Sequence, residues 1–186
     1  MNASHLPGRR NAAAPEGPVG DDDQPPSPGL TLELIDETDR LTEADRARLQ
    51  RTLTDAIGLA LQDRGGAHDV RVAVVDDARM SELHESHSGI SGTTDVLTFD
   101  LRDDEAGPLD VDLVVCRDEA ERRAAERAHG TVTELTLYGL HGVLHCLGYD
   151  DHGDESFRAM HAREDEILRE LGLGAAFSGG ETGGAS

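Results

Sequence analysis

Apolar residues recur along this chain with two different spacings, and segments of each kind alternate. Thr42 and Asp45 form an N-cap pair, which is typical of the start of a helix. Four apolar residues then follow at intervals of four, which puts them on one helix face: Leu49, Leu53, Ile57 and Leu61. By contrast, residues 70–75 form an apolar run rich in valine, which is typical of a buried strand. The pattern therefore predicts a protein built from both helices and strands.

The same reasoning predicts four strands and five helices. We expect strands at 30–37, 70–75, 95–101 and 111–116, and helices at 42–64, 76–86, 118–128, 132–147 and 155–171. Elements in this order predict an α/β (α+β) fold, in which a small mixed β-sheet of about four strands is covered by about five helices.

The polar ends of the chain set the expected domain limits. Residues 1–29 are rich in Pro, Gly, Ala and Asp, so they bury too little apolar surface to fold and are predicted to be a disordered tail. Residues 176–186 are rich in glycine and are predicted to be a flexible tail. The remaining residues, 30–175, form one predicted domain.

Composition changes this picture mainly through charge. The formal net charge is −21, which disfavours contact with anionic membranes and argues against a broad nucleic-acid-binding surface. RNA is not excluded as a substrate, because a bound divalent metal or a local arginine cluster overrides the average field. No apolar run approaches the ~20 residues of a membrane span, and no secretory signal is present. We therefore expect a cytoplasmic protein without membrane contact.

Three histidines near residue 145 are the strongest candidates for chemistry. His141 and His145 are four apart, which stacks both imidazoles on one helix face with Cβ atoms roughly 5–6 Å apart. Gly148 is typical of a helix end, and the turn that follows brings His152 within reach. Three imidazoles with an open fourth position are typical of catalytic zinc sites. The sequence therefore predicts one Zn²⁺ per chain, in a cleft beside the His-bearing helix.

Several short segments resemble a known family. Residues 141–145 are His-Gly-Val-Leu-His, and residues 147–150 are Leu-Gly-Tyr-Asp, followed by a closing His. This resembles the signature of the YbeY-type endoribonucleases, the bacterial rRNA maturation factors. Residues 93–99 (Thr-Thr-Asp-Val-Leu-Thr-Phe) and 112–115 (Asp-Leu-Val-Val) resemble two strands of that family in the same order. The resemblance covers about residues 30–173, and the His segment is its specific part.

The resemblance implies a zinc-dependent, single-strand-specific endoribonuclease that acts in rRNA 3′-end maturation and ribosome quality control. The implied metal ligands are His141, His145 and His152, which also act in catalysis through the metal. The implied substrate is single-stranded precursor rRNA, with ribosomal proteins or the small ribosomal subunit as further partners. We expect the protein to act as a monomer.

The sequence departs from the family pattern at three sites, one of which is Val111, where the family has a glycine before the aspartate. The family places its third His six residues after the second, where this chain has Asp151, and His152 comes one residue later. We prefer His152 as the ligand because the other two ligands are imidazoles. The family also has an Arg where this chain has Ser88. Either the neighbouring His87 replaces that cation as a catalytic residue, or the cation is absent.

Other interpretations remain open. A zinc peptidase would need Glu after the first His, where Gly142 stands. A non-catalytic assembly factor would hold structural zinc with a fourth ligand, Asp151 or Asp154.

Two further groups of residues have alternative interpretations. His84 and His87 face either the same cleft or solvent. A run of arginines forms either a patch for a nucleic-acid backbone or, as we favour, ion pairs with acidic neighbours: Arg117, Arg122, Arg123 and Arg127.

Overall fold

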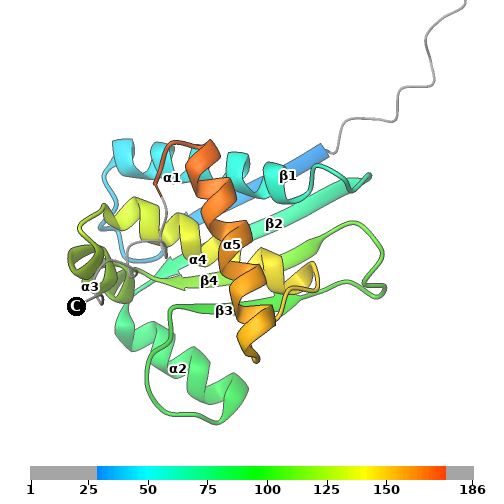
Figure 1. Cartoon of the computed structure of the whole chain (residues 1–186). Coiled ribbons are helices and arrows are strands. Elements are labelled where there is room, and N and C mark those ends of the chain that lie inside the picture. Colours follow the sequence, from blue (N-terminus) through cyan, green and yellow to red (C-terminus); the bar gives the residue numbers. More distant parts are fainter. Residues whose placement is uncertain (1–28, 175–186) are drawn as a thin grey trace, which may run out of the picture.

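The computed structural model describes residues 29–174, which form a mixed four-stranded sheet covered by helices (Figure 1). The strands are β1 (Gly29–Asp36), β2 (Ala67–Val75), β3 (Val96–Asp100) and β4 (Asp110–Cys116). They lie in the order β1-β2-β4-β3, with the first three parallel and β3 antiparallel to β4. The predicted mixed sheet is confirmed, and β3 forms one of its edges.

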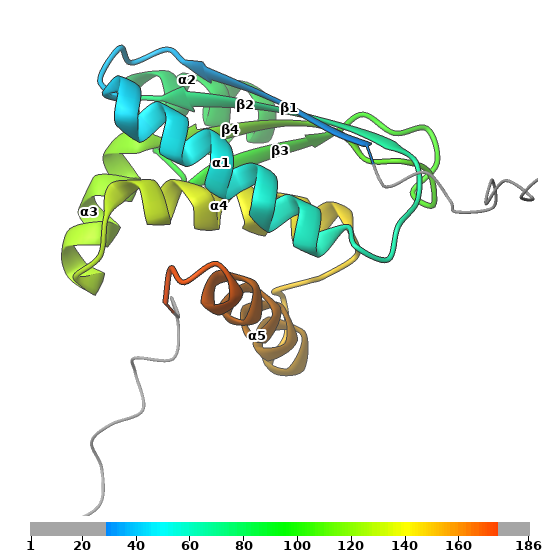
Figure 2. The same cartoon turned by 90° about the horizontal axis from the view of Figure 1, so that it is seen from above.

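Five helices occupy both sides of this sheet. They are α1 (Glu43–Ala60), α2 (Asp77–Ser88), α3 (Arg117–Arg127), α4 (Thr131–Cys146) and α5 (Asp154–Glu170). Figure 2 shows α1 and α4 side by side against one face, with α5 beyond them and α2 on the opposite face. The α+β fold predicted from the sequence is therefore confirmed. The two predicted tails lie outside the described residues, apart from Gly29, which begins β1.

Local sequence signals explain the first helix. The Thr42 side chain caps α1 by accepting a hydrogen bond of 3.1 Å from the Asp45 amide. The apolar face predicted for this helix is buried, and three of its residues have no exposed surface: Leu49, Leu53 and Ile57. The helix ends at Ala60, four residues before the predicted Arg64, and a short turn leads into β2.

The fourth helix is the centre of the molecule. Almost all residues between Val132 and Leu144 are buried, because α4 is enclosed by the sheet, α1, α3 and α5. A helix that is apolar on nearly every side is typical of a core position. Its C-terminal end carries His141 and His145, which are partly exposed. The packing of α4 therefore fixes the position of both imidazoles relative to β3 and α5.

Gly142 allows α4 to approach the sheet closely. A Cβ atom at this position would lie 2.6 Å from Thr98 Oγ1 and 2.8 Å from Leu113 Cδ2. Any side chain here therefore collides with β3 and β4. The glutamate that a zinc peptidase needs next to its first His has no room in this packing, which argues against that interpretation.

We expect Gly142→Ala to destabilise the fold by about 1–2 kcal/mol, since overpacking a core costs more than the gain in helix propensity. Gly58 in α1 is the matched control, because a Cβ there has no neighbour within 4 Å. Gly58→Ala should instead raise stability by about 0.5–1 kcal/mol. Urea unfolding of both variants measures the difference, and equal stabilities for wild type and Gly142→Ala would contradict the close approach.

Candidate metal centre

Two imidazoles meet at the C-terminal end of α4. The Nε2 atoms of His141 and His145 are 3.0 Å apart, and the two rings lie nearly perpendicular to each other. The Oδ2 atom of Asp151 lies 4.0 Å from the first Nε2 atom and 3.9 Å from the second. Three potential ligand atoms therefore surround one point, and all three side chains are partly exposed.

The outer nitrogens of both rings face hydrogen-bond acceptors. His141 Nδ1 lies 2.7 Å from Glu164 Oε1, and His145 Nδ1 lies 3.1 Å from the Tyr149 carbonyl oxygen. Because a carboxylate and a carbonyl oxygen accept hydrogen bonds, both Nδ1 atoms carry the proton. With both Nδ1 atoms protonated, the two Nε2 atoms, 3.0 Å apart, can share either a proton, when one ring is an imidazolium, or a metal ion. This arrangement fits a metal ion.

The turn after α4 brings Asp151 to the imidazole pair. Gly148 adopts a left-handed conformation (φ 92°), which ends the helix as its position in the sequence predicts. The Tyr149 amide then donates back to the Leu144 carbonyl at 3.0 Å, so the chain reverses over the last turn of α4. Two residues further, the Asp151 side chain faces the histidines.

His152 points away from this group. Its side chain is 86% exposed, and its Nδ1 atom lies 2.6 Å from Asp150 Oδ1 and 3.2 Å from Asp151 Oδ1. The hydrogen bond to Asp150 raises the pKa of His152. The structure thus brings together the two predicted histidines of α4 with Asp151 and not with His152. The assignment of His152 as the third ligand stays a prediction.

A buried carboxylate on α5 hydrogen-bonds one of the two histidines of the candidate centre. Glu164 of α5 has no exposed surface, and its two oxygens lie 2.7 Å from His141 Nδ1 and 2.6 Å from His161 Nδ1. Carboxylates in this position fix the tautomer and orientation of metal-binding histidines. Glu164 was not among the residues predicted from the sequence. Its signal is an acidic residue at spacings of four, three and four from the buried apolar residues Met160, Ile167 and Leu168 of α5.

The other candidate histidine lies elsewhere. His87 lies in the last turn of α2 and packs edge-on against Phe99 of β3, with ring centroids 4.7 Å apart. Val96 and Thr98 of the same strand face Gly142 on α4. Because side chains alternate across a strand, Phe99 and His87 lie on the opposite face of the sheet. The structure therefore does not bring His87 to the imidazole pair.

The predicted arginine run is held mainly by ion pairs. Arg117 lies 2.7 Å from Glu121, and Arg122 lies 2.7 Å from both Asp77 and Glu119. For Arg117 and Arg122 this agrees with the favoured interpretation of ion pairs with acidic neighbours.

A cavity of about 210 Å³ opens beside the imidazole pair, between α4, α5 and the start of β3. Its walls include His141, Asp151 and Glu164 from the centre itself, and also Asp95, Arg127 and Tyr138. A molecule in this cavity therefore lies against the candidate metal ligands. The candidate centre is thus accessible from one side.

The fold and the site together define a class: an α+β protein in which a buried helix carries a candidate His–His–carboxylate metal centre that opens on a cavity. Two histidines with one carboxylate are a donor set that catalytic zinc sites use. The family described as Endoribonuclease YbeY matches residues 34–172, and the chain belongs to this family of hydrolases that act on RNA. The resemblance seen in the His segment is therefore confirmed.

Relatives of this family match most of the chain. Endoribonuclease YbeY of Geobacillus thermodenitrificans is 30% identical over 154 residues, which cover 77% of this chain and 97% of the relative. The protein of the same name from Carboxydothermus hydrogenoformans is 35% identical over 125 residues, covering 67% and 87% of the two chains. The solution structure of TM1509 from Thermotoga maritima shares the fold, with a TM-score of 0.54 and 23% identity, over 83% of this chain and all of that one.

Proposed function

We propose that this protein is a zinc-dependent endoribonuclease that cuts single-stranded RNA in rRNA 3′-end maturation and ribosome quality control. Membership of the endoribonuclease family supports the reaction class. The observation that carries the metal part of the proposal is the pair of Nε2 atoms 3.0 Å apart, each on a ring whose Nδ1 faces an acceptor. When both rings are neutral, a divalent cation can accept the two Nε2 lone pairs together.

Zinc suits this donor set. Two nitrogen ligands of tetrahedral zinc, at about 2.0–2.1 Å from the metal, lie roughly 3.3 Å apart, close to the distance between the two imidazoles. The distances of 3.9 and 4.0 Å from Asp151 to the imidazoles support this carboxylate as the third ligand. The predicted ligand, His152, would reach the metal only after the turn rearranged and its hydrogen bond to Asp150 broke.

A catalytic centre agrees better with the surroundings than a structural one. Among residues 29–174, no fourth His, Cys, Asp or Glu joins the group formed by His141, His145 and Asp151. A structural zinc site would be closed by such a ligand, whereas a catalytic site keeps a position open to a cavity. When bound, zinc would supply a Lewis acid that polarises a phosphoryl oxygen and activates water. Glu164 and the Tyr149 carbonyl orient the two imidazoles for this role.

We propose precursor rRNA as the substrate and the small ribosomal subunit or its proteins as further partners. The protein would act as a monomer in the cytoplasm. Within residues 29–174 the structure contains no helix whose length and hydropathy suit a membrane span. With a net charge of −21, the chain must hold RNA through local cations and the metal rather than through its overall field.

The test is RNA cleavage by the full chain with zinc, after chelation, and after zinc is restored. We expect the zinc-loaded protein to cut a labelled single-stranded RNA at internal phosphodiester bonds and to leave a duplex of the same sequence intact. Cleavage should stop when a chelator is added. Full activity after chelation would contradict metal dependence. Absence of cleavage in the zinc-loaded protein would support the non-catalytic assembly factor instead.

Metal affinity should depend on pH through His141. Burial lowers the pKa of His141, but the hydrogen bond to Glu164 and the nearby carboxylates more than offset this, so its pKa lies above 6.5. Protonated His141 then stabilises the metal-free fold at low pH, and this contribution is lost as pH rises through the raised pKa. Zinc needs the deprotonated ring, so its affinity should rise over the same range. Competition titrations with a chromophoric chelator at a series of pH values measure this, and a rise in zinc affinity at the same pH in wild type and in Glu164→Gln would contradict the raised pKa of His141.

A further inference from the structure

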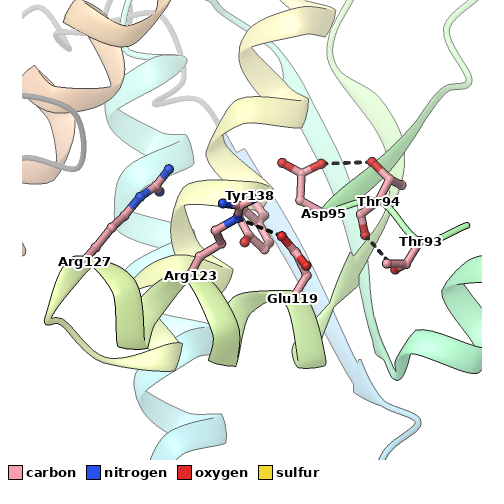
Figure 3. A pocket seen from close by; sticks show the side chains of 7 residues that line it. All are labelled: Thr93, Thr94, Asp95, Glu119, Arg123, Arg127 and Tyr138. Atoms are coloured by element: carbon pink, nitrogen blue, oxygen red, sulfur yellow. Dashed lines mark hydrogen bonds and ion pairs between the residues drawn. The ribbon is translucent and has the colours of Figure 1, made fainter.

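A second and larger cavity lies next to the one at the metal centre. Its volume is about 480 Å³, within the usual range for ligand sites, and it is bounded by α3, α4 and the chain that enters β3 (Figure 3). Its lining side chains are polar or aromatic: Thr93, Thr94, Asp95, Glu119, Arg123, Arg127 and Tyr138. None of these residues is a candidate metal ligand.

The hydroxyl group of Tyr138 in this wall has no partner. The residue is only 4% exposed, and its buried oxygen makes no hydrogen bond to the described residues 29–174. Burial raises the pKa of Tyr138, so the phenol stays protonated and is a hydrogen-bond donor. An unpaired buried hydroxyl is costly and rare in folded proteins. Its position in a cavity wall points to a ligand that accepts this hydrogen bond.

Cations from α3 line the same cavity. Arg123 donates to Glu119 at 2.8 Å and to Glu126 at 3.1 Å, and Arg127 donates to the buried Glu134 at 2.9 Å. A guanidinium has five N–H donors, so these contacts leave capacity for a further acceptor at Arg123. Glu119 is shared between Arg122 and Arg123, which offsets its charge. The cavity therefore offers donors to an anionic or polar ligand.

The two cavities adjoin. Asp95, Arg127 and Tyr138 line both the larger cavity and the smaller one that contains His141 and Asp151. A chain molecule that is bound at the metal centre can therefore continue past these three side chains into the larger space. A single-stranded RNA is such a molecule, and each of its nucleotides presents a phosphate, a ribose hydroxyl and a base edge.

We propose that the larger cavity is a nucleotide subsite, which holds one nucleotide of the RNA next to the phosphodiester at the metal centre. Arg123 and Arg127 face its phosphate, and Tyr138 donates its hydroxyl hydrogen to the ribose or base. The carboxylate of Asp95, which takes hydrogen bonds from Thr94 Oγ1 and the Val96 amide, is placed to accept from a ribose hydroxyl. This inference rests on the proposed function and adds residues that bind the substrate.

Tyr138→Phe is the sharpest test, because it removes only the unpaired hydroxyl. A purely structural role predicts equal or higher stability and unchanged RNA affinity. The subsite predicts the same stability change together with a fivefold to tenfold weaker affinity. Affinity is measured by fluorescence anisotropy of a labelled single-stranded RNA with the full chain in chelator, so that no RNA is cut.

Arg123→Gln and Arg122→Gln form a matched pair for the charge contribution. Both residues lie on α3 and both pair with Glu119, but only Arg123 lines the cavity. We expect Arg123→Gln to weaken RNA binding about fivefold and Arg122→Gln by less than about twofold. Equal effects of the two arginine variants, or wild-type affinity in Tyr138→Phe, would overturn the subsite.

These outcomes are separable from those for the reaction itself. Cleavage by wild type with unchanged binding in Tyr138→Phe would overturn the subsite and leave the proposed function standing. Binding that depends on Tyr138 without any cleavage would support the subsite and overturn the catalytic proposal.

Discussion

Metal analysis of the purified protein is expected to find about one zinc per chain, and almost none in His141→Ala or His145→Ala. Each substitution removes one of the two Nε2 atoms that lie 3.0 Å apart. RNA cleavage should fall with the metal content. His84→Ala is the control, since this partly buried histidine of α2 hydrogen-bonds the Gly92 carbonyl, away from the centre. Full zinc in both α4 variants would refute the metal centre.

The same measurement decides the third ligand. The distances to Asp151 lead us to expect that Asp151→Ala loses zinc and that His152→Ala keeps it. The opposite result, loss with His152→Ala and retention with Asp151→Ala, would establish the ligand predicted from the sequence. It would also show that the turn at residues 150–152 rearranges when zinc binds.

Glu164→Ala is expected to have the largest effect on stability. The substitution leaves the Nδ1 atoms of His141 and His161 without their shared acceptor in a fully buried position. Breaking a buried charged network of this kind costs about 3 kcal/mol or more. Zinc affinity should fall about 10- to 100-fold, because nothing then fixes the His141 ring. Urea unfolding and a chelator competition titration measure the two effects.

Glu164→Gln distinguishes the role of Glu164 in orienting the histidines from its role in filling the core. The amide keeps the volume of the carboxylate but offers one acceptor and one donor, so only one of the two histidines retains its acceptor. We expect a small loss of stability and about a tenfold loss of zinc affinity. Glu166→Gln is the matched control, since Glu166 lies on the same helix in an exposed pair with Arg163. Unchanged zinc affinity in Glu164→Gln would show that Glu164 serves the fold alone.

Features that depend on neighbouring residues could be predicted from the sequence. The spacing of four between His141 and His145 predicts two side chains on one helix face, and the structure brings their Nε2 atoms together. Gly148 predicts the end of that helix, and the helix ends there. The four strands and five helices were likewise predicted from apolar spacing, because burial of one face requires that spacing. The predicted end of α1 lies four residues too late, because the apolar spacing includes Leu61, which follows the last helical residue.

Elsewhere, the site depends on how distant segments pack. Glu164 meets His141 only because α5 packs on α4, and no periodicity relates residues 23 positions apart. Tyr138, Arg123 and Asp95 line one cavity because α3, α4 and the entry to β3 converge there. Side-chain direction in the short acidic turn also depends on local hydrogen bonds, such as the one from His152 Nδ1 to Asp150.

By itself, the sequence determined the secondary structure, the α+β class and the histidine pair, because each follows from periodicity within a few helical turns or strand residues. Only the tertiary structure decided that Asp151 and not His152 faces this pair, that Glu164 holds His141, and that Gly142 lies against β3. These contacts join residues whose proximity is set by the packing of α4 and α5 and by the turn between them. Packing of this kind depends on the whole core and not on any short pattern.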